Sequence, residues 1–508
     1  MRRRITFVQR SDSPFSHDQA ILTPDTLTIR SLDAAREDRA TFAFDEVLPE
    51  IWQVLKHCHQ LHIRWASERR YDAVTPFASR VSAGLHVFFT PGSIPGDSLD
   101  GLCILLKKVF GDELDCTTPE ESFITPPILS TRFASTPTFQ YYSSLSSVEG
   151  LVSYLENKIC GSDSECRAQA ERLRSADSVD LNYDSISHSL TVSGFWSRSA
   201  EGWSETISKH AAGADQIEIG LLGTERAVEP EEIKMGGLLG VVGRDDQLKP
   251  TLFSFPSRHH ALPEDATYSV SFPGPTGLHP TMTISLPSSS LNPPPAPPDA
   301  TCALHSYLTL PSTIFADKYQ LSSTDPLFLE SHHLVALRAV AGETDLEAPD
   351  WSVSNWGSNW LLELATPSDP GQVGEWNVTV PLHLRYLKPS ESGYRSASVP
   401  WPVVFWACTA EDGTKMGVNP FDRANLGWDG LFGTRTMFYQ LHPSADRLVE
   451  ELEVPVLKLE SEGLFQTRMI EVGTVAAIVF GLLWVLWKLG VVARSSTQSE
   501  ESRQKKAK

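Results

Sequence analysis

Residues 472–492 constrain this chain most strongly, because they read VGTVAAIVFGLLWVLWKLGVV and carry a single charge, Lys488. At ~1.5 Å per residue, a helix of this length crosses the ~30 Å hydrocarbon core of a bilayer. A lone apolar span must be helical, since lipid offers no partners for backbone N–H and C=O groups. Trp484 and Trp487 lie where an interfacial aromatic belt is expected. A buried core helix is the alternative, but so long an uncharged run near a chain end favours a membrane anchor.

The charges that flank this span predict its orientation. Five basic residues follow it against two glutamates, whereas the segment before it is acidic. An excess of Lys and Arg marks the cytosolic side of a membrane. We therefore expect a basic cytosolic tail at residues 493–508 and a lumenal or external location for the chain up to about residue 471.

The last residues of the chain suggest a localisation signal. Lys505 and Lys506 are fourth and third from the C-terminus, which resembles the dilysine signal that returns membrane proteins to the endoplasmic reticulum. Receptors read such signals, which are not anchors. A basic stop-transfer tail is the alternative. The N-terminus, MRRRITFV, has a basic start without an apolar core, so no signal peptide is expected there and the route of translocation stays open.

Composition narrows the function classes. A chain of 508 residues has room for two or three domains. The net charge of −20 argues against a nucleic-acid partner, because phosphate binding needs clustered Lys and Arg. The seven cysteines are too few for a disulfide-stapled scaffold, and their odd number leaves at least one without a partner inside the chain. Some bridges are expected in an oxidising lumen, but spacing does not assign them.

Residues 1–286 read as a mixed, strand-rich region with some helix. Helices are expected at residues 45–58, capped by Asp45, at 99–110, and at 148–159, where Ser146 and Glu149 would form a capping box. Strands are expected at residues 61–65, 84–90, 187–195, 216–222, 268–272 and 281–286, the last two paired through a Pro/Gly turn.

Residues 287–299 (PSSSLNPPPAPPD) contain six prolines and predict a semi-rigid linker. Beyond it, residues 300–458 read as a more sharply patterned β region, followed by a juxtamembrane stalk at 459–471. Residues 376–386 alternate apolar and polar side chains, and 403–406 are apolar on both faces, as in a central strand. The predicted fold is therefore mainly β with some α in the N-terminal half: a β-sandwich-like lumenal domain plus one C-terminal transmembrane helix.

Asn377 begins the only N-x-S/T sequence of the chain and falls on the polar face of its predicted strand. With the inferred topology, it is a candidate N-glycosylation site. His383 and Arg385 are expected to share that polar face, either to contact a partner or to remain solvated.

Signatures of catalysis are weak. On a helix, His59 and His62 would share a face while Cys58 points away, which disfavours a metal site. The glycines of residues 236–243 lack the order of a phosphate-binding loop and fit a turn-flanked strand better. We therefore expect no catalytic residues, no cofactor and no metal.

Three segments together resemble a known family. They are residues 310–321 (LPSTIFADKYQL), residues 383–387 (HLRYL) and residues 400–408 (PWPVVFWAC). Their order, followed by a C-terminal span, is similar to the PIG-X family, and residues 1–286 and 419–440 resemble its fungal protease-B-nonderepressible branch. Lys318-Tyr319-Gln320 departs from the more common Pro-Tyr-Glu and puts a role for an acidic residue there in doubt. Cys302 and Cys408, both in the matched region, are a candidate disulfide.

The resemblance implies a non-catalytic, glycosylated subunit in the lumen of the endoplasmic reticulum. Its partner would be the multi-spanning catalytic subunit of GPI mannosyltransferase I, which adds the first mannose to the glycosylphosphatidylinositol precursor. Gly473, Ala477 and Gly481 recur every four residues in the span and suggest a face for helix packing, although ordinary Gly and Ala usage explains them as well. The alternative functions are a lumenal chaperone with several clients and, less favoured, a lumenal hydrolase or glycosyltransferase.

Overall fold

The computed structural model describes residues 2–9, 17–92, 101–127, 138–199, 201–208, 216–410, 426–459 and 467–506, without side chains for residues 17, 467 and 493–506. The chain divides into two compact units. The larger comprises Met1–Tyr386 with Ala397–Leu452, and the smaller comprises Leu387–Ser396 with Glu453–Lys508. The chain is mainly β, as predicted.

A ten-stranded sheet dominates the N-terminal region of the larger unit. In spatial order its strands are β13 (Lys249–Pro256), β12 (Glu232–Val242), β11 (Ile217–Glu225), β1 (Arg2–Gln9), β4 (Ala35–Ala43), β9 (Ser189–Trp196), β8 (Ser178–Asp184), β5 (Cys58–Ala66), β6 (Gly84–Pro91) and β7 (Phe139–Ser143). Neighbours are antiparallel except β1 and β11. Residues 236–242 of the glycine-rich segment lie in β12 and Gly243 follows its end, so the strand prediction there is confirmed.

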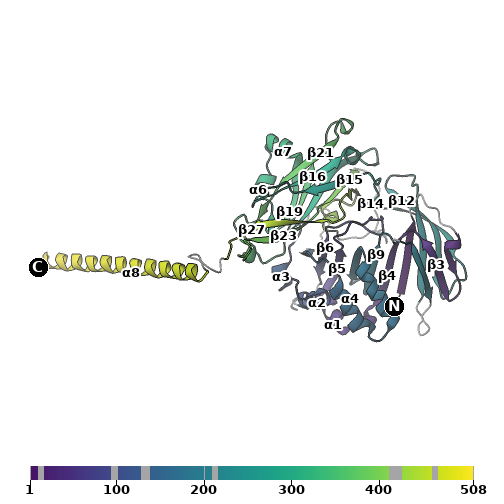
Figure 1. Cartoon of the computed structure of the whole chain (residues 1–508), viewed down its shortest axis with the longest axis horizontal. Helices are drawn as coiled ribbons and strands as arrows, with labels where there is room; N and C mark the ends of the chain where they lie inside the picture. Colours follow the sequence, from purple (N-terminus) through teal and green to yellow (C-terminus); the bar gives the residue numbers. More distant parts are fainter. Residues whose placement is uncertain are drawn as a thin grey trace. The chain divides into compact units, whose positions relative to one another are not determined.

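Short helices cover part of this sheet (Figure 1). They are α1 (Pro49–Leu55), α2 (Gly101–Phe110), α3 (Pro119–Ser122), α4 (Glu149–Tyr154), a π-helical turn η3 (Leu155–Cys160) and α5 (Ser164–Arg172). Disulfides Cys103–Cys116 and Cys160–Cys166 brace this layer, while Cys58 is free and buried. A small sheet of β2 (Ala20–Leu22), β3 (Thr26–Leu32) and β10 (Trp203–Ser208) buries a second core with β1 and β11.

The C-terminal region of the same unit contains two further sheets. One has the order β14 (His259–His260), β25 (Thr436–Gln440), β24 (Val403–Ala410), β17 (Ala300–Pro311), β20 (Gly357–Leu364) and β19 (Leu334–Gly342). The other has the order β21 (Glu375–Pro381), β16 (Thr281–Pro287), β15 (Thr267–Ser271) and β26 (His442–Pro443). The predicted pairing of residues 268–272 with 281–286 is confirmed as β15–β16, and 403–406 belong to the interior strand β24.

Smaller elements complete the chain. They are β18 (Ile314–Phe315) with β22 (His383–Leu384), β23 (Tyr394–Pro400) with β27 (Val449–Pro455), helices α6 (Lys318–Leu321) and α7 (Pro326–His332), and 3₁₀ turns η1 (His17–Gln19), η2 (Phe44–Glu46), η4 (Leu173–Ser175), η5 (Ser288–Leu291), η6 (Asp350–Ser352), η7 (Pro370–Gln372) and η8 (Asp429–Leu431).

Two helix predictions need correction. The helix predicted at residues 45–58 is a 3₁₀ turn followed by α1, and Cys58 already belongs to β5. Ser146 does not cap the next helix, because the N-cap of α4 is Val148 and has no side-chain hydrogen bond. The hydrophobic spacing identified both helices, but their ends depend on tertiary contacts that a local pattern does not contain.

The compact units of the structure do not follow the boundary predicted at the proline-rich segment, residues 287–299. Strand β16, before the proline-rich segment, pairs along its length with β21, far beyond it. The proline-rich segment packs against the six-stranded sheet, where Trp406 Nε1 donates to Ser290 O at 3.1 Å and the Tyr439 hydroxyl donates to Pro295 O at 2.5 Å. The regions on either side of it therefore share one compact unit.

Two buried glutamines connect the N-terminal and C-terminal regions. The Gln440 amide accepts from Arg80 N at 2.7 Å and donates to Arg80 O at 3.0 Å. Gln140 is fully buried; its Oε1 accepts from Asn359 Nδ2 at 2.8 Å and its carbonyl accepts from Trp356 Nε1 at 3.0 Å. A cluster that includes Ala66, Tyr307 and Phe405 packs apolar surface from both regions together.

The smaller unit contains α8 (Thr467–Lys506), the yellow helix of Figure 1. Its segment Arg468–Val492 is, among the described helices, the one long and apolar enough to span a membrane. This agrees with the predicted single span.

Replacing Gln440 with Leu should lower the free energy of unfolding by about 2–4 kcal/mol, because the Arg80 N–H and C=O would lose their partners while buried. The urea-unfolding midpoint of the full chain measures this effect. Gln372→Leu, at an exposed side chain, should change the midpoint little. Equal effects of the two substitutions would show that the Gln440 bonds do not stabilise the junction.

Candidate functional site

The two segments that carry the family resemblance in the middle of the chain meet in space. Strands β18 and β22 pair antiparallel, with Phe315 opposite His383. Pro381 is the last residue of β21, and beyond it Leu382 N and Leu384 N donate to Pro280 O and Leu278 O, each at 2.9 Å. The chain then continues with Arg385 N donating to Thr313 O at 2.9 Å. Residues about 70 positions apart thus build one surface feature of the larger unit.

Arg385 is buried rather than solvent-facing, which corrects the prediction for this strand. Its side chain is 2% exposed, and Nη1 donates to Asp345 O and Ala348 O, each at 2.7 Å. The guanidinium lies 4.2 Å from the ring centre of Phe315, a cation–π distance. The alternation holds through Leu384, which is buried, and stops where β22 ends, so Tyr386, predicted to be buried, is 65% exposed.

Burial lowers the pKa of Arg385, and Glu343, Asp345 and Asp350 act in the opposite direction. Within the described part of the chain, its Nε and Nη2 have no hydrogen-bond partner. The two bonds from Nη1 tie down the loop at residues 343–352, so the main role of Arg385 is to hold that loop.

His383 is half-buried beside Arg385. Its ring stacks on Phe315 at 5.3 Å between centres, and its Nδ1 lies 2.9 Å from Nδ1 of His279. Burial lowers the pKa of His383, and His279 lowers it further. One imidazole therefore donates to the other, and the pair remains stable only while at least one ring is neutral.

Three exposed aromatic side chains surround this feature, and we refer to them as the aromatic surface. Tyr319 is 69% exposed, Trp351 is 54% exposed and Tyr386 is 65% exposed. Backbone and side-chain bonds join the segments that carry them: Asp350 N donates to Tyr386 O at 3.1 Å, and Lys318 Nζ donates to Thr344 Oγ1 at 3.2 Å. Exposed aromatic groups on a rigid support are typical of protein interfaces.

The pattern analysis missed the aromatic surface. Tyr319 and Tyr386 lie inside the segments that resemble the family, so that resemblance was the available signal. Trp351 lies in a loop and has no periodic signal. Its position depends on Arg385, whose contacts with residues 345 and 348 are long-range.

The other predicted site residues lie elsewhere. Asn377 is exposed on β21, and its Oδ1 accepts from Ser285 Oγ at 2.6 Å. Cys302 and Cys408 face each other on β17 and β24 and are joined in a disulfide. Lys505 and Lys506 fall outside the residues whose side chains are described, so the retrieval signal stays a prediction.

Cys58, His59 and His62 lie on strand β5 and not on a helix, which was the geometry assumed for them from the sequence. The register of β5 against β6 shifts between Cys58 and Gln60, so His59 lies at an irregularity of the strand. His59 Nδ1 lies 2.7 Å from Ser185 Oγ, and His62 is buried near Asp180. Among the described residues, no group of three or more His, Cys, Asp or Glu side chains is placed to hold a metal ion.

Comparisons with known proteins bear on this site. The family model described as PIG-X / PBN1 matches residues 275–490, a range that contains all three segments of the resemblance. "Protein pbn1" of Aspergillus oryzae is 69% identical over the whole of both chains. "Protein pbn1" of Emericella nidulans is 67% identical over 98% of this chain and 97% of its own. "Protein pbn1" of Neurospora crassa is 40% identical over 99% of this chain and 98% of its own.

Replacing Arg385 with Met should lower the free energy of unfolding by about 2 kcal/mol, because two buried carbonyls lose a charged donor. The loop at residues 343–352 should also become more sensitive to limited proteolysis. Arg338→Met is the matched control, because Arg338 is exposed and its pair with Glu363 should contribute less than about 1 kcal/mol. If Arg385→Met left the loop as resistant as wild type, the proposed anchoring would be wrong.

Five buried histidines should make the fold sensitive to mild acid. Burial lowers the pKa of His259 to about 3 and lowers the pKa to about 4 for each of His62, His86, His260 and His305. The unfolded chain binds protons near pH 6.5, so stability is fully present above this pH and is lost as pH falls toward 4.

At pH 5 each histidine should then cost on the order of 2 kcal/mol. Urea midpoints measured between pH 7 and pH 5 should fall, and His305→Phe should reduce that pH dependence. His188→Gln, at an exposed histidine, should not. A pH-independent midpoint over this range would contradict the prediction.

Proposed function

Since the chain belongs to the PIG-X/PBN1 family, we propose that it serves GPI-anchor biosynthesis as a non-catalytic subunit of GPI mannosyltransferase I, anchored in the endoplasmic reticulum membrane. An accessory role in GPI-anchor biosynthesis is what the family supports. The proposal adds the partner, which is the multi-spanning catalytic subunit, and the location of the larger unit in the lumen.

The aromatic surface is the observation that carries the proposal. Tyr319 and Tyr386 come from the two central segments of the family resemblance, Trp351 comes from the loop that Arg385 holds, and all three aromatic side chains are exposed. Burying such side chains against a partner yields binding free energy, at about 25 cal/mol per Å² of apolar area. Arg385 holds the supporting loop in place before the partner binds, which reduces the entropy cost of association.

The membrane helix supports the same mechanism. A single span confines the chain to the membrane that contains the partner, and this raises the effective concentration of one for the other. Binding to the folded form of the partner then stabilises that form by mass action. On this proposal the chain assists mannose transfer by maintaining the catalytic subunit, and takes no part in bond making.

The location is also proposed rather than observed. The basic tail with Lys505 and Lys506 supports a cytosolic C-terminus with retrieval to the endoplasmic reticulum. The exposed position of Asn377 supports a glycan on the lumenal side.

Co-purification tests the proposal. Full-length wild type should recover one stoichiometric multi-spanning protein from solubilised membranes. The double variant Trp351→Ser/Tyr386→Ser should recover at least roughly tenfold less of it, since two interface aromatics commonly contribute more than 1.4 kcal/mol together. Tyr394→Ser, at a tyrosine that is 55% exposed elsewhere in the chain, should leave recovery unchanged.

Depletion of the chain should in parallel cause the un-mannosylated precursor to accumulate. Normal precursor levels, or recovery of a heterogeneous and substoichiometric set of proteins, would instead favour the chaperone alternative.

A further inference from the structure

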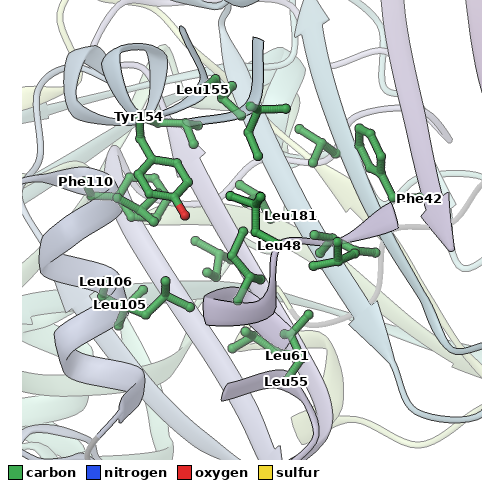
Figure 2. A pocket seen from close by; sticks show the side chains of 18 of the residues that line it. Phe42, Leu48, Leu55, Leu61, Leu105, Leu106, Phe110, Tyr154, Leu155 and Leu181 are labelled. Carbon is green, nitrogen blue, oxygen red and sulfur yellow. The ribbon is translucent and has the colours of Figure 1, made fainter. Parts of the chain in front are cut away.

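An apolar cavity lies between the ten-stranded sheet and the helices that cover it. Figure 2 shows labelled side chains that converge on it from the helical layer, such as Leu105 and Leu155, and from the strands, such as Leu61 and Leu181. Its volume is about 100 Å³. The lining is apolar apart from the carboxylate of Glu46 and the hydroxyl of Tyr154. A space lined in this way does not hold ordered water, which needs two to four polar partners.

A close helix contact and two disulfides brace the helical layer beside this space. Gly150 on α4 touches α2 so closely that a Cβ there would lie 2.4 Å from Phe110 O. The chain then continues as the wider π turn η3, which supplies Leu155 and Ile159 to the lining. Disulfides Cys103–Cys116 and Cys160–Cys166 attach at α2 and at the end of η3. Interruptions of this kind in helices often occur at functional sites.

The cavity adjoins a second, polar hollow of about 400 Å³, and Leu102 and Leu105 line both. Ile104 lines the hollow and is 67% exposed, and Ile159 lines the cavity and is 40% exposed, so each space has apolar side chains that reach the surface. Isolated apolar side chains on a surface are ordinary, but here they continue a buried apolar lining.

The hollow has a local positive excess on a strongly acidic chain. Its lining includes Lys56, Lys108 and Glu50. Glu50 pairs with Lys108 and also accepts from the Tyr154 hydroxyl at 2.5 Å. Lys56 is exposed and makes no ion pair within the described residues, so one positive charge remains available. An apolar cavity beside a basic hollow is complementary to an anion with an alkyl tail.

We propose that this cavity binds the end of the alkyl chain of a single-chain anionic amphiphile, with its head group in the hollow beside Lys56. The volume suits a linear chain and is smaller than the ~150 Å³ of an apolar cavity that holds one benzene ring, so a sterol does not fit. Lipid alkyl chains are available to the protein, because it has a helix long enough to span a membrane. The proposal does not depend on the partner proposed above, and its test contains no partner.

Photolabelling of the full chain in phosphatidylcholine nanodiscs tests the proposal. The probe is dodecanoic acid with a diazirine near its methyl end, and the labelled peptides are mapped by mass spectrometry. We expect labelling in residues 102–110 and 151–159, in addition to α8, which contacts lipid and serves as the internal reference. A diazirine sterol should label α8 alone.

Variants identify the site. Leu155→Phe fills the cavity, and Ile104→Glu places a negative charge in the adjoining hollow, at an exposed position outside the core. Each should reduce labelling of residues 102–110 relative to α8 by roughly tenfold, the change that about 1.4 kcal/mol of lost affinity produces. Leu252→Phe and Leu252→Glu, at an exposed leucine on β13, are the matched controls and should change nothing.

The head group is tested by charge. Lys56→Gln should reduce labelling by the acid but not by dodecanol that carries the same diazirine. Labelling confined to α8 in wild type, sterol labelling of residues 102–110, or full labelling in both Leu155→Phe and Ile104→Glu would each overturn the proposal. Equal loss with acid and alcohol in Lys56→Gln would overturn the assignment of the head group.

Discussion

Two buried amide side chains set the architecture of the larger unit. The Gln440 side chain pairs with both backbone groups of Arg80, and Gln140 accepts from Asn359 through its side chain and from Trp356 through its backbone carbonyl. Loss of one of these bonds would leave a buried polar group unpaired, at a cost of about 1–3 kcal/mol. The six-stranded sheet is therefore fixed in position against the ten-stranded one. Apolar packing around Tyr307 and Phe405 adds to this junction but specifies its geometry less strictly.

The candidate binding surface depends on this rigidity. Arg385 can anchor the loop at residues 343–352 because β22, which precedes it directly, is held against β18. The loop in turn presents Trp351 beside Tyr386. A surface that is ordered before binding loses little entropy on association, which suits an accessory subunit better than a flexible one.

Sequence patterns predicted the elements whose environment is simple. The span in α8 is apolar on all sides, so its composition predicts it. The hairpin β15–β16 and the central strand β24 bury regular faces, so the spacing of their apolar residues predicts them. The pattern failed at Arg385 and Tyr386, because β22 ends at Leu384 and the alternation of buried and exposed side chains stops there. It also failed for the proline-rich segment, because pairing of β16 with β21 is a contact between distant residues that no local window contains. The family resemblance identified the segments that contain Tyr319 and Tyr386. The loop at residues 343–352 and its anchoring by Arg385 became apparent only in the structure.

The central claim is that a membrane-anchored β module acts from the lumenal side of the endoplasmic reticulum membrane. Protease added to sealed microsomes tests it most directly, with antibodies against residues 300–458 and against residues 493–508. The account predicts that the large fragment is protected until detergent is added, while the C-terminal epitope is removed at once. Digestion of residues 300–458 in intact microsomes, with the C-terminal epitope spared, would contradict the orientation and the proposed partnership with it.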